Sequence, residues 1–294
     1  MANLKKIRTR IASVKSTRQI TSAMKMVSAA KLRKAQDKIV KLRPYAGKLH
    51  EILVRLTRSL DDAEGGNIYG PKASQDKVLL VVITSNRGLC GGFNANVIRE
   101  TKRVILEKYS EQHNKGNLSI ITIGKKGFDY LRKQKQNIIR EHNDLLNELT
   151  FENVSVVASG IMQSFVNGEY DKVDIIYNQF KNAAVQNLTT ESFLPVETKP
   201  ADDITISPTD YIYEPSQEEI IKELIPKSLR IQFYKAVLDS FVAEHGARMT
   251  AMHKATDNAT ELIRDLTLQY NKARQATITN QILEVVSGAE ALKG

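Results

Sequence analysis

The segment with the clearest potential for phosphate chemistry is glycine-rich and spans Thr84–Asn94, TSNRGLCGGFN. A turn of this kind between a strand and a helix is typical of nucleotide-binding proteins, in which backbone amides at a helix N-terminus hold a phosphate. The spacing matches neither GxGxxG nor GxxxxGK[ST], the two common phosphate-binding patterns. Because glycine primarily permits tight backbone turns, the favoured interpretation is a structural turn, with phosphate binding as the alternative.

Other reactive side chains are few and scattered. Cys90, the one cysteine, has no histidine close to it in the sequence, which favours a packed thiol over a nucleophile. The five histidines form no i,i+4 pair and no HExxH motif, so a metal site has little support. His245 is expected at a helix interface, and Asp202-Asp203 is expected to be solvated charge. The residues alone therefore predict no catalytic site, no metal and no cofactor.

Charge is spread unevenly over the 294 residues. Residues 1–60 contain sixteen basic side chains and two acids, Asp37 and Glu51, so they carry +14, whereas the remainder carries −4. Such asymmetry indicates an acidic partner: nucleic acid, anionic lipid or an acidic protein surface. The basic start is also typical of a mitochondrial transit peptide, but it continues for some 60 residues without a cleavage site. The expected compartment is the reducing cytosol or its membrane face.

The beginning of the chain has the spacing of a coiled coil. From Leu4 to Leu60, every third or fourth residue falls on one stripe, which defines a heptad seam. A helix of this length reaches roughly 85 Å, so most of it should protrude from a compact domain. Pro44 is expected to kink the helix without ending it, because the seam resumes in register.

The end of the chain repeats this spacing. The seam runs from Tyr234 to Ala273 and continues with a one-residue shift through Ile278, Ile282 and Val285. Pro226 suits a first helical position, and Ser287-Gly288 is expected to end the helix. Neither stripe is wide enough to be buried alone. The two helices should therefore pair as an antiparallel coiled coil, with an intermolecular coiled coil as the alternative.

The N-terminal seam changes character between residues 18 and 28. Its positions there are polar: Arg18, Thr21, Lys25 and Ser28. The apolar side chains move off the seam, to Ile20, Met24, Met26 and Val27. Two interpretations remain open: a stutter that alters the supercoil locally, or a surface that faces a third body.

The middle of the chain alternates between strands and helices. Strands are predicted at Val78–Thr84, Leu118–Ile123, Val173–Phe180 and Asn187–Val196. Helices are predicted at Asn94–Tyr109, Gly127–Gln134 and Glu152–Asn167. This alternation is typical of an α/β layer domain with a largely parallel sheet. The predicted organisation is a coiled-coil helix (1–60), a linker (61–77), an α/β head domain (78–200), a linker or foot (201–217) and a second coiled-coil helix (218–287).

Three segments carry a resemblance to a known family. Residues 11–27 contain IASV and QITSAMKMV, the loop 87–94 reads RGLCGGFN, and residues 256–275 contain TDNA and LTLQYNKARQ. Together they resemble the gamma subunit of rotary (F-type) ATP synthase, over essentially the whole chain and in the same helix–head–helix order. The resemblance implies a Rossmann-like head, and the missing transit peptide fits a bacterial form.

The resemblance implies a central-stalk rotor that performs no bond chemistry. In this family the coiled coil stands inside a hexamer of three alpha and three beta subunits, and the head rests, with an epsilon subunit, on a membrane ring of c subunits. Ion flow turns the ring and the shaft, which drives the beta sites through ATP synthesis, or hydrolysis in reverse. The implied location is peripheral, at the cytoplasmic face of the cell inner membrane.

The resemblance also implies contact residues on the shaft. Met24 and Lys25, in the polar window, would meet the acidic lever segment of a beta subunit. Arg274, Gln275 and Thr279 match positions that touch a beta loop near the top of the shaft.

Further positions are implied with less detail, and two residues depart from the family pattern. Arg248 matches another family position on the long helix, and Tyr211 and Glu214 match the foot near the c ring. Asn86 stands where the family loop usually has Asp, and Gly246 where Ala is usual. Glycine in a helix costs about 0.5–1 kcal/mol relative to alanine, so a softer shaft is expected there.

Two other classes of function compete with this interpretation. A basic coiled coil that binds nucleic acid suits the +14 segment, but residues 1–60 contain one aromatic residue, Tyr45, for base stacking. A helix lying on an anionic membrane is the other, but the apolar stripe is narrow and follows a coiled-coil period. No apolar run exceeds the six residues Val78–Ile83, against about 20 for a membrane span.

The turn at Gly88–Gly92 leads to a first prediction. We expect no tight nucleotide binding there, because neither phosphate-binding pattern is present. Isothermal titration calorimetry of the full chain with ATP checks this, and micromolar affinity that is lost on Gly88→Ala would contradict it.

Overall fold

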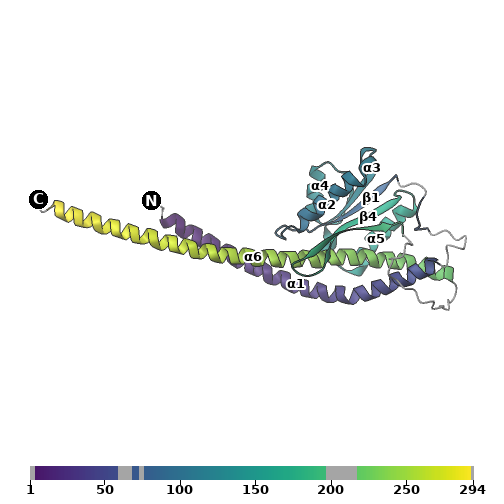
Figure 1. Cartoon of the computed structure of the whole chain (residues 1–294), viewed down its shortest axis with the longest axis horizontal. Helices are drawn as coiled ribbons and strands as arrows, with labels where there is room; N and C mark the ends of the chain where they lie inside the picture. The colour runs from purple at the N-terminus through teal and green to yellow at the C-terminus, as the bar shows by residue number, and fades with distance from the viewer. Residues whose placement is uncertain (1–3, 59–67, 73–75, 197–216, 293–294) are drawn as a thin grey trace. The chain divides into compact units, whose positions relative to one another are not determined.

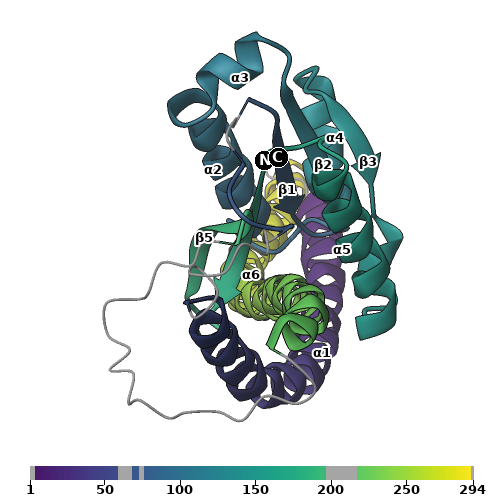
Figure 2. The ribbon, with the colours of Figure 1, turned by 90° about the vertical axis from the view of Figure 1, so that its right-hand side faces the viewer.

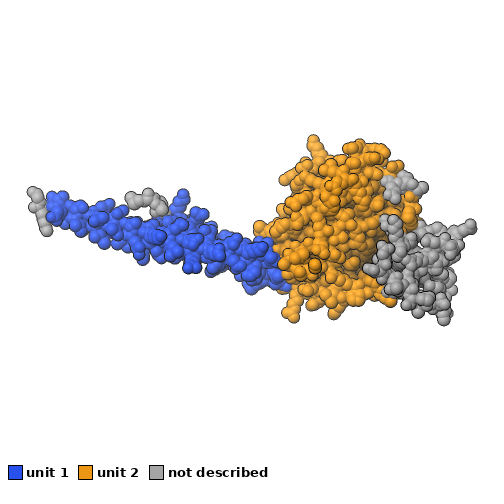
Figure 3. Space-filling model, viewed as in Figure 1, with its two compact units in different colours: residues 1–29, 248–294 blue, residues 30–247 orange. Residues whose placement is uncertain are grey.

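The computed structural model describes residues 4–58, 68–72, 76–196 and 217–292. Two helices dominate it, α1 (Leu4–Arg58) and α6 (Gln217–Ala291). Between them lie β1 (Val78–Ile83), α2 (Phe93–Glu107), α3 (Ser110–Asn114), β2 (Leu118–Ile123), α4 (Lys125–Lys133), β3 (Ile138–Glu141), the 3-10 helix η1 (Asp144–Leu146), α5 (Phe151–Val166), β4 (Lys172–Phe180) and β5 (Gln186–Leu194) (Figure 1). The chain forms two compact units, one of Met1–Ala29 with Arg248–Gly294 and one of Ala30–Ala247 (Figure 3).

The second unit is built on a five-stranded sheet in the order β3-β2-β1-β4-β5. Strands β1 to β4 are parallel, with Val78 opposite both Leu118 and Lys172, and β5 joins antiparallel to β4 at the edge. The predicted α/β domain with a largely parallel sheet is therefore confirmed. The strand order changes direction beside β1, the position at which open α/β sheets commonly bind ligands.

Both faces of this sheet are covered, as strand alternation requires. Leu80 and Val82 point to the side of α2 and pack in one cluster with Val97 and Val104. Leu79 points to the opposite side, which faces α5 (Figure 2). Burying each such side chain contributes about 1.5–3 kcal/mol, so this sandwich is the main source of stability in the second unit. No described helix contains a segment both long and apolar enough to cross a membrane.

The predicted strands and helices of the middle region match β1, α2, β2, α4, α5, β4 and β5 within about three residues. Three elements were missed: β3, α3 and the three-residue 3-10 helix η1. Strand β3, IIRE, is a short and largely exposed edge strand, so it has no apolar run to mark it. Helix α3, SEQHN, is a single polar turn with no buried residue.

The predicted C-terminal helix, residues 218–287, starts within one residue of the observed helix, but the expected roles of Pro226 as a first helical position and of Ser287-Gly288 as the end were wrong. Helix α6 begins at Gln217, nine residues before Pro226, and it continues through Gly288 to Ala291. In a helix interior proline costs about 3 kcal/mol and glycine about 1 kcal/mol relative to alanine, and here the rest of the long helix is favourable enough to offset both. Helix α1 likewise continues through Pro44, as predicted.

The heptad seam predicted for α1 is the less exposed side of that helix. In the second unit it buries Leu32, Ala35, Ile39 and Leu49. On α6, the predicted seam positions Leu238 and His245 are buried in the same unit, and Met252, Ala259 and Leu266 are buried in the first unit. Hydrogen bonds pair residue 21 with 256 and residue 43 with 239, so the two helices run antiparallel.

An ion pair joins α1 to α6 in the second unit. The Nη2 atom of Arg43 donates two hydrogen bonds, to Oδ1 of Asp239 and to the carbonyl oxygen of Phe180, each at 2.7 Å. The Asp239 side chain is fully buried, whereas that of Arg43 is 40% exposed. Burial raises the pKa of Asp239, and Arg43 opposes that shift. The pair therefore holds together both helices and the end of β4.

This ion pair leads to a stability prediction. Arg43→Gln removes the hydrogen-bonded counter-charge of a buried carboxylate and leaves only the more distant Lys235 near it. The loss should be about 2 kcal/mol, below the 3–5 kcal/mol of a fully buried pair because Arg43 is partly exposed. An acid whose pKa is raised in the folded state binds its proton more tightly there, so stability falls as pH rises from the ordinary aspartate pKa to the raised one. Urea unfolding of the variant should therefore show a larger loss at pH 8 than at pH 5.

The matched control is Arg33→Gln, at an exposed arginine of the same helix. It should change the free energy of unfolding by less than about 0.5 kcal/mol. Equal losses in the two variants, or a loss at Arg43 that does not depend on pH, would contradict this account of Asp239.

Candidate interaction site on the coiled coil

The polar window of α1 remains paired with α6 in the first unit. The hydroxyls of Thr21 and Thr256 lie 2.8 Å apart, and Nζ of Lys25 lies 3.3 Å from Nδ1 of His253. Each threonine hydroxyl also has its own helix carbonyl within reach, so each has an alternative acceptor. The seam here is closed by hydrogen bonds instead of apolar packing.

The apolar residues of this window lie on the outside. Ile20, Met26 and Val27 are each about 60% exposed, whereas Met24 and Lys25 are half-buried. Large apolar side chains gathered on one exposed helix surface are typical of an interaction site. Of the two interpretations, this exposure favours a surface that meets a third body.

The structure adds two residues that sequence reasoning missed. His253 and Asp257 lie one helical turn apart on α6, with Nδ1 of His253 3.4 Å from Oδ2 of Asp257. The i,i+4 spacing of a histidine and an acid could have identified them. The Nδ1 atom accepts from Lys25 when unprotonated and can donate to Asp257 when protonated.

The expected contact residues near the end of α6 are all on the surface. Arg274, Gln275 and Thr279 are exposed. The predicted continuation of the seam through Ile278, Ile282 and Val285 was wrong as regards burial, because these side chains are 45–72% exposed. Apolar periodicity identifies a helix surface that is suited to burial, but it does not show that a partner is present. Among the described residues, none covers the surface of Ile278, Ile282 and Val285.

The remaining expected contact residues divide into two groups. Arg248 is buried, 7% exposed. Tyr211 and Glu214 lie outside the described residues.

The glycine-rich loop after β1 is closed by the protein's own groups. Helix α4 begins beside it, and its first three amides donate to the Asn86 side chain (3.1 Å), the Ser85 carbonyl (3.0 Å) and the Thr84 hydroxyl (2.8 Å). Such amides are the usual donors to phosphate. Since they are already bonded, the start of α4 is not open to a phosphate, and the first residues of the loop serve to hold that helix in place.

The hydrogen bonds of Asn86 require a side-chain amide at this position. Its Nδ2 donates to the carbonyl of Asn143 at 2.7 Å while its Oδ1 accepts from Lys125. An aspartate could accept but not donate. Gly124 is equally constrained: its φ is +101°, and a Cβ there would lie 2.2 Å from the Thr84 carbonyl oxygen.

The other candidates for chemistry are buried within the protein. Cys90 is buried, and its sulfur is within hydrogen-bond distance of the Ser85 hydroxyl and the Asn94 amide, in agreement with a packed thiol. His245 is buried with its ring 4.5 Å from that of Phe241. The described residues contain no group of three His, Cys, Asp or Glu that could hold a metal ion.

These observations define a class: an α/β domain inserted between two long helices that pair antiparallel, with most of the candidate contact residues on the helix surfaces. A sequence model of the ATP synthase family matches residues 3–292. The chain is 57% identical to the ATP synthase gamma chain of Flavobacterium johnsoniae, over the full length of both, and 47% identical to that of Geobacter sp. strain M21, again over the full length of both. It belongs to the ATP synthase gamma chain family.

Solved structures share the fold. A chain of the Euglena gracilis mitochondrial ATP synthase aligns with a TM-score of 0.68 and 22% identity, over 98% of this chain and 94% of that one. A chain from the central stalk and c-ring of the Tetrahymena thermophila enzyme aligns with a TM-score of 0.59 and 24% identity, over 80% and 99%.

The threonine pair in the seam leads to a prediction. Thr21→Val or Thr256→Val alone should lower the free energy of unfolding by about 0.5 kcal/mol, because the remaining hydroxyl loses its partner across a half-buried seam and keeps only its own helix carbonyl. The double variant should be about as stable as the wild type, since two apolar groups of the same shape then meet. A double-mutant cycle in urea measures this coupling, and strictly additive losses would contradict the contact.

Proposed function

We propose that this chain is the central-stalk rotor of a bacterial ATP synthase. Ion flow through a membrane c ring would turn it, and its rotation would drive three catalytic beta subunits through their conformational cycle. The observation that carries this proposal is membership of the gamma chain family over the full length. The chain itself would be non-catalytic, with bond chemistry left to the beta subunits.

The build of the two long helices supports a mechanical role. Helix α1 has 55 residues and α6 has 75, which corresponds to roughly 80 and 110 Å of helix. Both continue through an internal proline, and they pair antiparallel. A pair of helices bonded along a seam resists bending and twisting better than one helix, which suits transmission of torque.

Residues of the polar window would contact the acidic lever of a beta subunit. Lys25 supplies a half-buried positive charge held beside His253, and Met24 lies next to it. Screened surface ion pairs contribute about 0–1 kcal/mol each, whereas buried interface anchors contribute about 2 kcal/mol or more. Weak contacts of the first kind suit a surface that must turn against its partner.

The exposed end of α6 would serve as the seat of the shaft. Arg274, Gln275 and Thr279 would contact a beta loop, and the exposed apolar residues after Ala273 would be covered by the alpha and beta subunits. Arg248 would act further along the same helix. The foot with Tyr211 and Glu214 would meet the c ring.

The same proposal covers organisation and location. Segments 1–60 and 218–287 would form the shaft, 78–200 the head, 61–77 a linker and 201–217 the foot. The alpha3beta3 hexamer, the epsilon subunit and the c ring would be the partners. The chain would lie peripherally at the cytoplasmic face of the membrane through this complex.

Charge reversal at Lys25 tests the rotor assignment. In the assembled complex, Lys25→Glu should lower ion pumping per ATP hydrolysed about two- to fivefold, the effect of removing one surface ion pair worth up to about 1 kcal/mol. Folding should be little affected, because exposed pairs contribute little stability. Hydrolysis is measured by phosphate release and pumping by dye quenching in vesicles.

Lys115→Glu, an exposed lysine of the head, makes the same charge change away from the shaft and should leave the ratio unchanged. Equal loss of pumping and hydrolysis, or loss of neither, would count against a coupling role for Lys25. Nucleic acid binding that falls steeply with salt, without association with alpha and beta subunits, would favour the competing class.

A further inference from the structure

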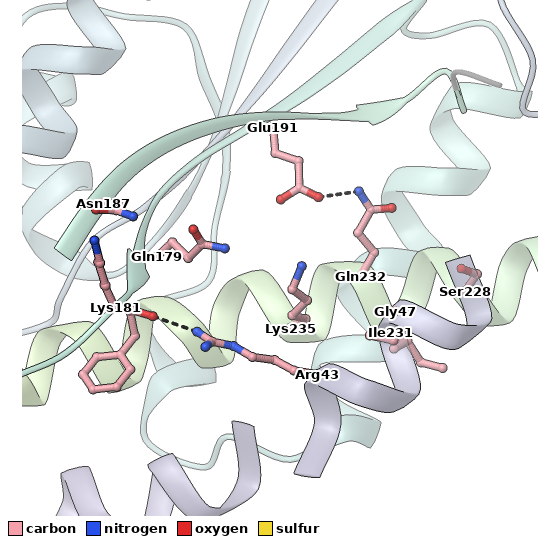
Figure 4. Close-up of a pocket in the computed structure, with 12 residues that line it drawn as sticks. Arg43, Gly47, Gln179, Lys181, Asn187, Glu191, Ser228, Ile231, Gln232 and Lys235 are labelled. Atoms are coloured by element: carbon pink, nitrogen blue, oxygen red, sulfur yellow. Dashed lines mark hydrogen bonds between the residues drawn. The ribbon is translucent and has the colours of Figure 1, made fainter. Parts of the chain in front are cut away.

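We propose that a cavity in the second unit binds a small anion that carries phosphate groups. The cavity has a volume of about 660 Å³ and lies between the β4–β5 hairpin, α6 and α1 (Figure 4). This volume is within the range of small-molecule sites, roughly 300–1,000 Å³. The site is separate from the glycine-rich loop, and the inference goes beyond the rotor function.

Three cations and one acid line the cavity. Arg43 comes from α1, Lys181 follows β4, Lys235 is on α6, and Glu191 is on β5. Arg43, the β4–β5 hairpin and Lys235 are far apart in the sequence and come together only in the fold. In Figure 4, Glu191 points from the strand and Lys235 from the helix into the same space.

Two of these charges already have partners in the protein. Arg43 is bonded to Asp239 and to the Phe180 carbonyl. Glu191 accepts from the Gln232 amide at 2.7 Å and from the Tyr177 hydroxyl at 2.8 Å, one bond to each carboxylate oxygen. Both neutral donors hold Glu191 in place without cancelling its charge.

The two lysines remain available. Among the described residues, neither Lys181 nor Lys235 forms an ion pair or a hydrogen bond, although Lys235 is close enough to Asp239 to lower its pKa. With Arg43 and Asp239 neutralising each other, the lining carries a net charge of +1. Two unpaired ammonium groups at one concave surface attract an anion, and lysine is a common phosphate ligand.

The rest of the lining indicates more than a bare phosphate. The side-chain amides of Gln179 and Asn187 and the hydroxyl of Ser228 also line the cavity. These amides and this hydroxyl can form hydrogen bonds to hydroxyl groups or ring nitrogens of a ligand. The lysines recognise only its negative charge. The expected ligand is therefore a phosphate ester or a diphosphate, whose negative charge is attracted by the lysines while its organic part meets the amides.

Calorimetric titration of the full chain with inorganic phosphate, pyrophosphate and ADP tests the proposal. Pyrophosphate should bind with a Kd on the order of 1 mM, and more weakly as salt rises. The double variant Lys181→Gln/Lys235→Gln should bind at least about tenfold more weakly, since two charge-assisted contacts are lost. Glu191→Gln removes the one negative charge and should bind about threefold more tightly.

The matched control is Lys115→Gln/Lys227→Gln, which removes two exposed lysines of the same unit outside the cavity. It should keep wild-type affinity. ADP binding more tightly than pyrophosphate would assign the site to an ester, and equal or weaker ADP binding would assign it to an inorganic anion. The proposal is overturned if no probe binds saturably at 20 mM, or if the double variant and its control bind alike.

Discussion

The pairing of α1 with α6 is the constraint on which the rest of the structure depends. Each helix has a stripe too narrow to be buried alone, so the two ends of the chain must return to one another. Everything between residues 58 and 217 is therefore inserted between two helices that pair antiparallel. The seam stays in contact even where it becomes polar, at Thr21 and Lys25, and this leaves apolar side chains of the window outside.

The α/β domain has the strand order of a ligand-binding sheet. The helix start beside its glycine-rich loop, however, is occupied by the protein's own side chains. Side chains of Thr84 and Asn86 bond the amides at the start of α4 that would otherwise meet a phosphate. The fold therefore does not by itself imply a nucleotide site there, in keeping with the general independence of fold and function. A cavity in the second unit lies elsewhere, where β4 and β5 face the helices.

Prediction from the sequence succeeded where periodicity is strong and failed where position in the fold decides. The buried run Val78–Ile83 and the seam from Leu32 to Leu49 could be read directly, because apolar spacing and burial coincide there. Strand β3 could not be predicted, because an exposed edge strand has no apolar pattern. It is defined only by its backbone hydrogen bonds to β2. Ile278 and Ile282 keep the apolar spacing of a seam but remain exposed.

The sequence by itself determined the two helices, their seam, the α/β order and the residues that carry the family resemblance, because these depend on local spacing and composition. Tertiary structure alone decided which polar groups meet. Arg43 and Asp239 are 196 positions apart, and Lys181 and Lys235 come from different elements. No local pattern encodes such pairs, because their distance is set by how the sheet packs against the helices.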